Sequence, residues 1–334
     1  MFEYPSRIRL AQTPTPLQAL DRISEQLGGP RIWIKRDDLT GSALSGNKIR
    51  KLEFVVAQAL EEGCDTLITC GGLQSNHCRA TAIVGAQLGL NVCLILREEG
   101  SAEPDGNLLL DHLVGANIKV IPRRNYFKNL NQYFEQYSQE YMAEGSKPFS
   151  IPTGASDEIG IWGYIAACEE LKKDFSDNNI SPRFIVCASG SGGTQAGLTA
   201  GAAMQKLGSE VIGFAVCDDE NYFIKKVNED LSAWYQRYGL NNKIDCDINK
   251  LKISVNDNYI GPGYAQAEQE IFNTINYVAK TEGIFLDPVY TGKAFYGLMS
   301  EIKAGNFSNQ SDVVFVHTGG VFGLFPQRKN FSFY

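Results

Sequence analysis

The chain has 334 residues, of which 43% are hydrophobic and 21% are charged, which is the composition of an ordinary soluble globular protein. Its net charge of −7 provides no basic surface for nucleic acid, and no run approaches the roughly 18 apolar residues of a membrane-spanning helix. The N-terminus lacks the basic and apolar segments of a signal peptide, so we expect a cytoplasmic protein.

The predicted elements alternate between strands and helices along most of the chain. Helices are expected over residues 17–29, 48–62, 78–89, 108–115, 129–145, 159–175 and 265–283. Strands rich in Val, Ile and Leu are expected within residues 31–39, 65–72, 91–98, 116–123, 183–187, 210–218, 250–256 and 313–320. This alternation predicts an α/β fold of two units, with mainly parallel sheets covered on both faces and a cleft at the carboxyl ends of the strands.

Cysteine and histidine provide no evidence for a metal site. The eight cysteines are scattered without a CxxC pair, and several lie in apolar runs such as TLITC and NVCLIL. A free thiol in such a run behaves as a small hydrophobic side chain, so we expect reduced core cysteines. Only three histidines are present, without an HxxxH pattern, and we therefore predict no metal site.

Residues 40–54 (TGSALSGNKIRKLEF) place Lys48, next to Asn47, where a Gly/Ser-rich turn meets a helix. The positive end of the helix dipole lowers the pKa of an amine at that position, and a lowered pKa is what a lysine needs to form an imine. The alternative is a solvated surface lysine, which is the usual state of this residue type.

Two glycine-rich segments follow predicted strands. In Cys70–Arg79 (CGGLQSNHCR), Ser75 and Asn76 open a helix whose unpaired N–H groups suit a carboxylate, although the same residues could simply cap the helix. In Ala188–Gly197 (ASGSGGTQAG), the backbone forms a nest of N–H groups at a helix N-terminus. Such a nest can hold a phosphate, and the alternative is a tight turn without a ligand.

Two further segments contribute tyrosines. Tyr290 lies in residues 286–294 (LDPVYTGKA), and Tyr264 lies on a rigid turn in residues 261–264 (GPGY). A phenol at such a strand end can point into a cleft as an acid or a base, or it can be a structural part of the core. A phosphate nest, an imine-forming lysine and a cleft with phenols together indicate pyridoxal phosphate (PLP), which stabilises carbanions.

Five motifs in this order, SGNKIRKLEF, GGLQSNHCRATA, SGSGGTQAGL, DPVYTGKA and HTGG, resemble those of the fold-type II (tryptophan synthase β-like) PLP enzymes. More narrowly, they resemble the group of 1-aminocyclopropane-1-carboxylate (ACC) deaminase and D-cysteine desulfhydrase, over nearly the whole chain. The resemblance implies a homodimer in which each chain has a large PLP-binding domain of residues 1–50 and 159–334. A smaller α/β domain, residues 51–158, is then inserted in it.

The resemblance also implies the site residues. It makes Lys48 the Schiff-base lysine and makes Ser75 the residue that meets the substrate carboxylate. Tyr264 and Tyr290 then line the substrate pocket. The cofactor is expected to be held by Lys48, Asn47, Asn76, Ser191, Gly192, Gly193, Thr194, Thr291 and Thr318.

Two positions distinguish the activities of this group. ACC deaminases have glutamate and leucine where this chain has Thr291 and Thr318, and threonines are the pattern of D-cysteine desulfhydrases. A neutral hydroxyl leaves the pyridine nitrogen unprotonated and the cofactor a weaker electron sink, which suffices for expelling sulfide but not for opening a cyclopropane.

The sequence therefore predicts β-elimination on a small amino acid, D-cysteine, giving pyruvate, sulfide and ammonia. Either Lys48 or Tyr290 could remove the α-proton. The alternatives are L-cysteate sulfo-lyase, ACC deaminase and, from another class, a non-catalytic binding protein that kept the PLP fold.

Overall fold

The structure, a computed structural model, describes residues 2–98, 103–307 and 311–333. Its strands are β1 Leu17–Ala19, β2 Arg31–Lys35, β3 Thr66–Gly72, β4 Asn91–Arg97, β5 Asn117–Ile121, β6 Pro148–Ser150, β7 Phe184–Ser189, β8 Glu210–Ala215, β9 Ser254–Asn256 and β10 Asp312–Val316. Its α-helices are α1 Asp21–Leu27, α2 Lys48–Glu61, α3 Asn76–Leu88, α4 Gly106–Leu113, α5 Arg123–Ala143, α6 Trp162–Asp177, α7 Gly193–Met204, α8 Glu220–Trp234, α9 Gln269–Glu282 and α10 Thr291–Lys303.

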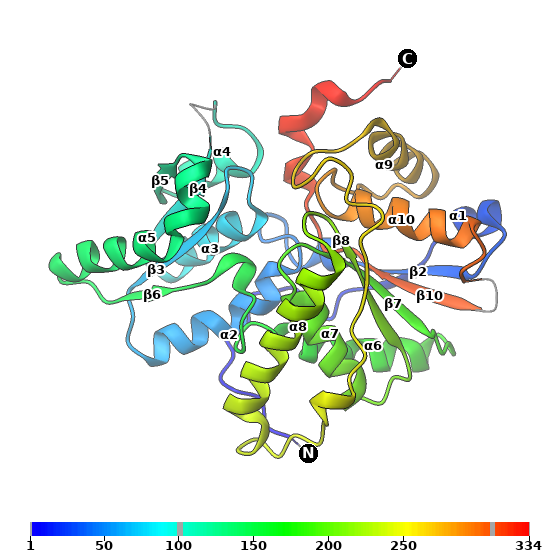
Figure 1. The fold of residues 1–334 in the computed structure, drawn as a ribbon, viewed down its shortest axis with the longest axis horizontal. Coiled ribbons are helices and arrows are strands. Elements are labelled where there is room, and N and C mark those ends of the chain that lie inside the picture. Colours follow the sequence, from blue (N-terminus) through cyan, green and yellow to red (C-terminus); the bar gives the residue numbers. More distant parts are fainter. Residues whose placement is uncertain (1, 99–102, 308–310, 334) are drawn as a thin grey trace.

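Within these residues the strands form two sheets (Figure 1). A six-stranded sheet has the order β1-β2-β10-β7-β8-β9, and a four-stranded sheet has the order β5-β4-β3-β6. All neighbouring strands run parallel except β1, which pairs antiparallel with β2. The predicted α/β fold with mainly parallel sheets is confirmed, whereas the domain boundaries at residues 50 and 159 stay a prediction.

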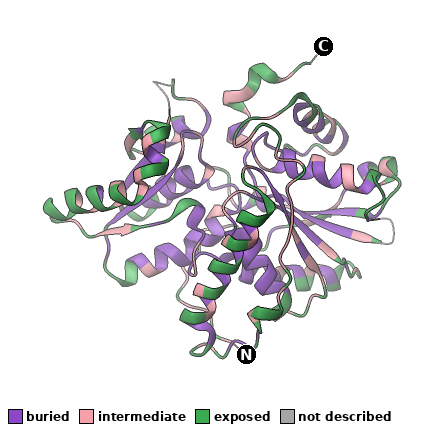
Figure 2. Ribbon diagram, in the orientation of Figure 1, coloured by how far each residue is buried: buried purple, intermediate pink, exposed green. Residues whose placement is uncertain are grey.

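The six-stranded sheet is covered on both faces, as its apolar strands require. Alternate residues of β10 point to opposite sides: Val313 and Phe315 pack in the cluster that includes α1, α9 and α10, and Val314 and Val316 pack in the cluster that includes α6 and α7. The same two groups of helices lie on opposite sides of the sheet in Figure 1. The central strands β2, β10 and β7 are buried almost throughout, whereas α5 is largely exposed (Figure 2).

The expected helix over residues 17–29 is wrong at its start. Leu17–Ala19 forms β1, and α1 begins only at Asp21. The backbone amides of this segment pair with β2, since Leu20 N donates to Ile32 O at 2.8 Å. This pairing is a tertiary contact that overrides the helical spacing of the leucines.

The starts of α5 and α9 differ most from the prediction among the other helices. The helix expected from residue 129 begins at Arg123, and Asn129 itself has a non-helical backbone (φ −126°) that marks a kink. The helix expected from residue 265 begins at Gln269, because Ala265 has a left-handed backbone with φ +60°.

All eight cysteines are free thiols, and each is buried except the half-buried Cys217. In the described parts of the chain, no helix is long and apolar enough to cross a membrane.

Candidate active site

A cavity of about 620 Å³ lies at the carboxyl ends of β3, β4 and β7, which come from both sheets. This is the end of a parallel sheet at which ligands bind. The cavity is lined by all the predicted site residues except Gly193 and Thr291: Asn47, Lys48, Ser75, Asn76, Ser191, Gly192, Thr194, Tyr264, Tyr290 and Thr318. The folding of the chain therefore brings together motifs that lie far apart in the sequence.

Lys48 is the first residue of α2. The turn before it packs directly on the end of β10: Asn47 N donates to Thr318 O at 3.1 Å, and a Cβ at Gly46 (φ +110°) would lie only 2.7 Å from that oxygen. The Lys48 amine donates to Asn47 Oδ1 at 3.1 Å. Burial lowers its pKa to about 8, so this amine is neutral and nucleophilic far more often near neutral pH than that of an ordinary lysine.

The Ala188–Gly197 segment forms the predicted loop and helix start. Gly192 has φ +83°, and α7 begins at the next residue. Ser191 Oγ lies 2.8 Å from Ser156 Oγ, and the Gly193 N–H donates to Ser156 Oγ at 3.2 Å. On the Lys48 side, Asn47 Nδ2 donates to Thr194 Oγ1 at 2.8 Å.

Two lysines beside this loop were missed from the sequence. Lys51 is fully buried and donates to Ser156 Oγ and Gly154 O, both at 3.0 Å. Burial holds its pKa well below the ordinary value. Lys226 lines the cavity and donates to Ser156 O at 3.2 Å. Lys51 lies three residues after Lys48, on the same face of α2, and that spacing was the available signal.

These groups fit the phosphate of PLP. A side chain at Gly193 would come within 2.9 Å of Lys51 Nζ, so only a glycine lets the loop approach this buried amine. The N-terminus of α7, the loop amides and hydroxyls and two lysines together suit a dianion. Lys48 lies on the same cavity wall, in contact with Asn47, and can hold the cofactor's aldehyde carbon.

Ser75 and Asn76 open α3, and both alternatives for this segment have support. Ser75 does cap the helix, because its Oγ accepts from Cys78 N at 3.2 Å. Asn76 Oδ1 accepts a hydrogen bond from Asn107 Nδ2 at 2.9 Å. This bond uses the oxygen of the Asn76 amide, and the N–H donors of that amide stay available for another partner. Both residues line the cavity, where the first N–H groups of α3 can bind a carboxylate.

Arg79, one turn into α3, connects this helix to the turn before Lys48. Its guanidinium donates to Ala43 O at 2.7 Å and to Ser45 O at 2.8 Å. The helix start that suits a carboxylate and the turn that carries the lysine are therefore joined by hydrogen bonds from one buried side chain.

The two predicted tyrosines form a pair. Tyr264 and Tyr290 share a hydrogen bond between their hydroxyls at 2.7 Å. Lys48 Nζ lies 5.9 Å from the centre of the Tyr290 ring. Burial raises the pKa of both phenols, so each keeps its proton at neutral pH and serves as a hydrogen-bond donor.

The two threonines are placed differently. Thr318 lines the cavity. Thr291 is fully buried, and its hydroxyl donates to Asp287 Oδ1 at 2.7 Å and accepts from Asp287 N at 2.8 Å. Thr291 opens α10, and the Asp287 carboxylate caps that helix start, so both hydrogen-bonding functions of the Thr291 hydroxyl are used in the cap.

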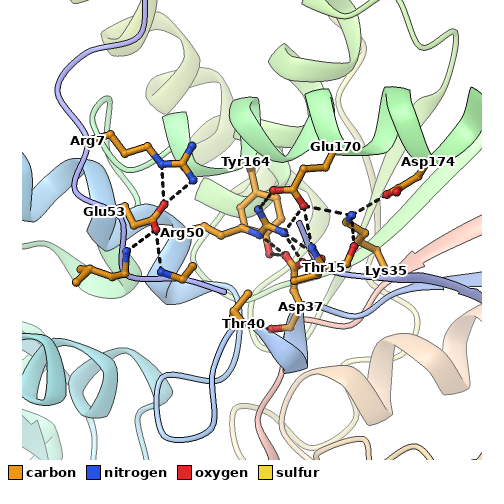
Figure 3. A network of polar contacts seen from close by, with 12 residues as sticks. Arg7, Thr15, Lys35, Asp37, Thr40, Arg50, Glu53, Tyr164, Glu170 and Asp174 are labelled. Atoms are coloured by element: carbon orange, nitrogen blue, oxygen red, sulfur yellow. Dashed lines mark hydrogen bonds and ion pairs between the residues drawn. The ribbon is translucent and has the colours of Figure 1, made fainter. Parts of the chain in front are cut away.

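A buried polar network holds the first turns of α2 (Figure 3). Asp37 is fully buried and accepts two hydrogen bonds from Arg50, both at 2.8 Å. Arg50 also donates to Glu170 of α6 at 2.7 Å, and Lys35 forms an ion pair with Asp174 at 2.6 Å. The network connects the N-terminal segment, α2 and α6. Its central member, Arg50, lies two residues after Lys48 in α2.

The comparisons agree with this geometry. Residues 8–319 match the family described as pyridoxal-phosphate dependent enzyme. A Thermotoga maritima protein whose provisional name is ACC deaminase is 42% identical over 97% of this chain and 99% of its own length. The mitochondrial bifunctional D-cysteine desulfhydrase/ACC deaminase of Arabidopsis thaliana is 41% identical, over 95% of this chain and 79% of its own.

A solved structure supports the same assignment. The crystal structure of an ACC deaminase homologue superposes with a TM-score of 0.86 and 35% sequence identity, and it covers 98% of this chain and 95% of its own. The chain therefore belongs to the pyridoxal-phosphate-dependent enzymes and is a PLP-dependent lyase of the group that includes ACC deaminases and D-cysteine desulfhydrases.

Proposed function

We propose that this enzyme catalyses β-elimination on a small amino acid and that its substrate is D-cysteine, which it converts to pyruvate, sulfide and ammonia. The observation that carries this proposal is the Thr318 hydroxyl, which lines the cavity where an ACC deaminase has leucine. The relatives alone do not separate the two activities, since their names include both.

PLP supplies the electron sink for the carbanion at the substrate α-carbon. In our proposal, Ser75 and the first amides of α3 bind the substrate carboxylate. Lys48, whose pKa burial lowers to about 8, accepts the α-proton. Tyr290, whose pKa burial raises, stays protonated and acts as a donor rather than a base.

The electron demand of the reaction supports the choice of D-cysteine. In our proposal the Thr318 hydroxyl would face the pyridine nitrogen. A neutral hydroxyl cannot keep that nitrogen protonated, so the cofactor would be a moderate electron sink. Loss of an α-proton and of hydrosulfide needs less carbanion stabilisation than opening a cyclopropane ring. The carboxylate of Asp287 accepts hydrogen bonds from the backbone N–H groups of residues 289–291, at the start of α10.

The test is a substrate panel with the purified holoenzyme. D-cysteine, L-cysteine, L-cysteate and ACC are incubated separately, and pyruvate, 2-oxobutanoate, sulfide and sulfite are assayed. We expect pyruvate and sulfide from D-cysteine and no 2-oxobutanoate from ACC. Release of 2-oxobutanoate would refute the argument from the threonines, and a coloured protein that converts none of the four would favour a binding protein.

The variant Thr318→Leu, which carries the ACC deaminase residue, is the matched comparison. We expect it to keep the cofactor and to lose activity on D-cysteine. Unchanged kinetics would mean that Thr318 does not determine the activity.

A further inference from the structure

One cationic side chain of the cavity has no role in the function proposed above. Arg97 is the last residue of β4 and lines the cavity. It comes from the four-stranded sheet, whereas β7, which leads into the glycine loop, belongs to the six-stranded sheet. It stands beside Gly72, because a Cβ at Gly72 would lie 3.8 Å from Arg97 Nη2 and 3.6 Å from the Tyr264 ring. The guanidinium therefore reaches the wall formed by Tyr264, close to the loop that leads to Ser75.

Three aromatic rings lie close to this guanidinium. Its central carbon lies 4.8 Å from the centre of the Tyr264 ring, and 5.3 Å from those of both Tyr126 and Phe127. Within the described ranges, none of the ion pairs involves Arg97. A guanidinium stacked on ring faces still directs N–H donors outward in its own plane.

Among the residues that the structure describes, no ion pair compensates the charge of Arg97. The neighbouring phenols of Tyr264 and Tyr290 are neutral at pH 7, since burial raises the pKa of each. Asp218 also lines the cavity, and none of the ion pairs among the described residues includes it. The half-buried guanidinium of Arg97 is therefore available to an anionic ligand, with which it can form charge-assisted hydrogen bonds.

The carboxylate of an amino acid already has a binding place at the start of α3. In the function proposed above, the amino group of the substrate would lie beside Lys48, and the phosphate of the cofactor would lie at the glycine loop. The side chain of the substrate would then contact the wall formed by Tyr264 and Arg97.

We propose that Arg97 forms a subsite for the substituent on the substrate β-carbon, and that this subsite selects substituents that carry a negative charge or leave as an anion. The substrate class is then amino acids with a β-thiol, β-sulfinate or β-sulfonate group. The inference rests on the proposed β-elimination and deepens it.

The chemistry balances without a further reagent. The Cα–H bond breaks and its proton passes to Lys48. The Cβ–S bond breaks and its electron pair leaves on sulfur, as hydrosulfide, sulfoxylate or sulfite beside the guanidinium. The resulting enamine of pyruvate takes up one water and gives pyruvate and ammonia, so no oxidant or reductant is consumed.

The test compares the wild-type holoenzyme with Arg97→Gln and Arg97→Lys. The matched control is Arg31→Gln, which removes a surface arginine that also stacks on a ring, Trp33, at 4.6 Å. Each protein is given cysteate, cysteine sulfinate, cysteine and alanine in both configurations. Pyruvate, sulfide and sulfite report turnover, and the change in cofactor absorbance reports binding, including that of alanine, which has no leaving group.

We expect Arg97→Gln to weaken cysteate binding and its kcat/KM by about 10- to 100-fold, the value of a charged hydrogen bond. Alanine binding should change by less than about twofold. Arg97→Lys should keep part of the preference for the anion, which a variant with a damaged fold would not. Arg31→Gln should behave as the wild type.

Three results would overturn the inference. Equal losses for alanine and cysteate in Arg97→Gln would place Arg97 at the α-carboxylate. A wild-type enzyme that converts cysteine but does not bind cysteate or the sulfinate has no such subsite, although the β-elimination would stand. Cysteate binding that survives Arg97→Gln refutes the role of Arg97. By contrast, failure of every substrate to turn over refutes the β-elimination, and cysteate binding to the holoenzyme would still test the subsite.

Discussion

Replacing Asp37 with asparagine hardly changes the size of the side chain, but it should lower the free energy of unfolding strongly. The Asp37 carboxylate has two oxygens, and each accepts two hydrogen bonds: Oδ1 from Thr15 and Arg50, and Oδ2 from Arg50 and Tyr164, all at 2.6–2.8 Å. In asparagine, an NH₂ group takes the place of one oxygen and faces two donors, whichever way the amide is turned.

The magnitude follows from burial. Both Asp37 and Arg50 have fully buried side chains. Removing one charge of a buried pair costs about 3–5 kcal/mol in the free energy of unfolding. Arg50 keeps its bonds to Glu170, so we expect a loss at the lower end of that range. The control is Asp21→Asn, which breaks a 2.8 Å pair with Arg31 whose side chains are 68% and 47% exposed. An exposed pair contributes only about 0–1 kcal/mol.

Urea unfolding of the holoenzyme variants, followed by fluorescence, measures both losses. The pH dependence gives a second check. The Arg50 guanidinium lowers the folded-state pKa of Asp37 below 3.8, so the ionised group stabilises the fold above that pH and loses its contribution as pH falls through the folded-state pKa. The difference between wild type and Asp37→Asn should be constant near neutral pH and shrink in acid. A loss as small as that of the control, or one that does not shrink in acid, would refute the reasoning.

Four other predictions concern the cofactor and the assembly. Lys48→Ala should lose the visible absorbance of the Schiff base, and an unchanged yellow protein would contradict the assignment of this lysine. Since the Lys48 pKa is lowered to about 8, incorporation of PLP into the apoenzyme should speed up with pH and level off above that value. A rate that rises on toward 10.5, the ordinary lysine pKa, would contradict the effect of burial. Lys51→Met should weaken PLP binding by about 10- to 100-fold in fluorescence titrations, as expected for a lost charged hydrogen bond, and unaltered binding would mean that the phosphate lies away from Lys51. We also predict a homodimer, which light scattering should detect at twice the chain mass of 36.8 kDa, whereas a monomer mass would refute it.

The fold was predictable where local pattern and tertiary structure agree. The buried runs of β3, β4, β7 and β10 are continuous apolar segments, and such runs form central strands of parallel sheets. Leu17–Ala19 was not predictable in this way, because its strand exists only through pairing with β2. The same is true of the start of α9, which depends on the backbone of Ala265.

The site was predictable where glycine and turn chemistry mark a ligand. The turn before Lys48 and the loop at Ser191 both line the cavity as the motifs indicated. Lys51 was missed because a lysine in a helix is usually solvated, and only packing against α6 and the glycine loop buries it. The resemblance placed Thr291 at the cofactor, but its hydroxyl donates to Asp287, four residues earlier. The sequence motif did not indicate this hydrogen bond.

The hydrogen bonds from Arg79 to Ala43 O and Ser45 O also constrain how the enzyme can move. They fasten the start of α3 to the turn before α2, so the carboxylate-binding end of the cavity and the lysine cannot separate without breaking two buried charge-assisted bonds. We therefore expect these two parts to move together during a catalytic cycle, and substrate entry and product release to draw their motion from other walls of the cavity.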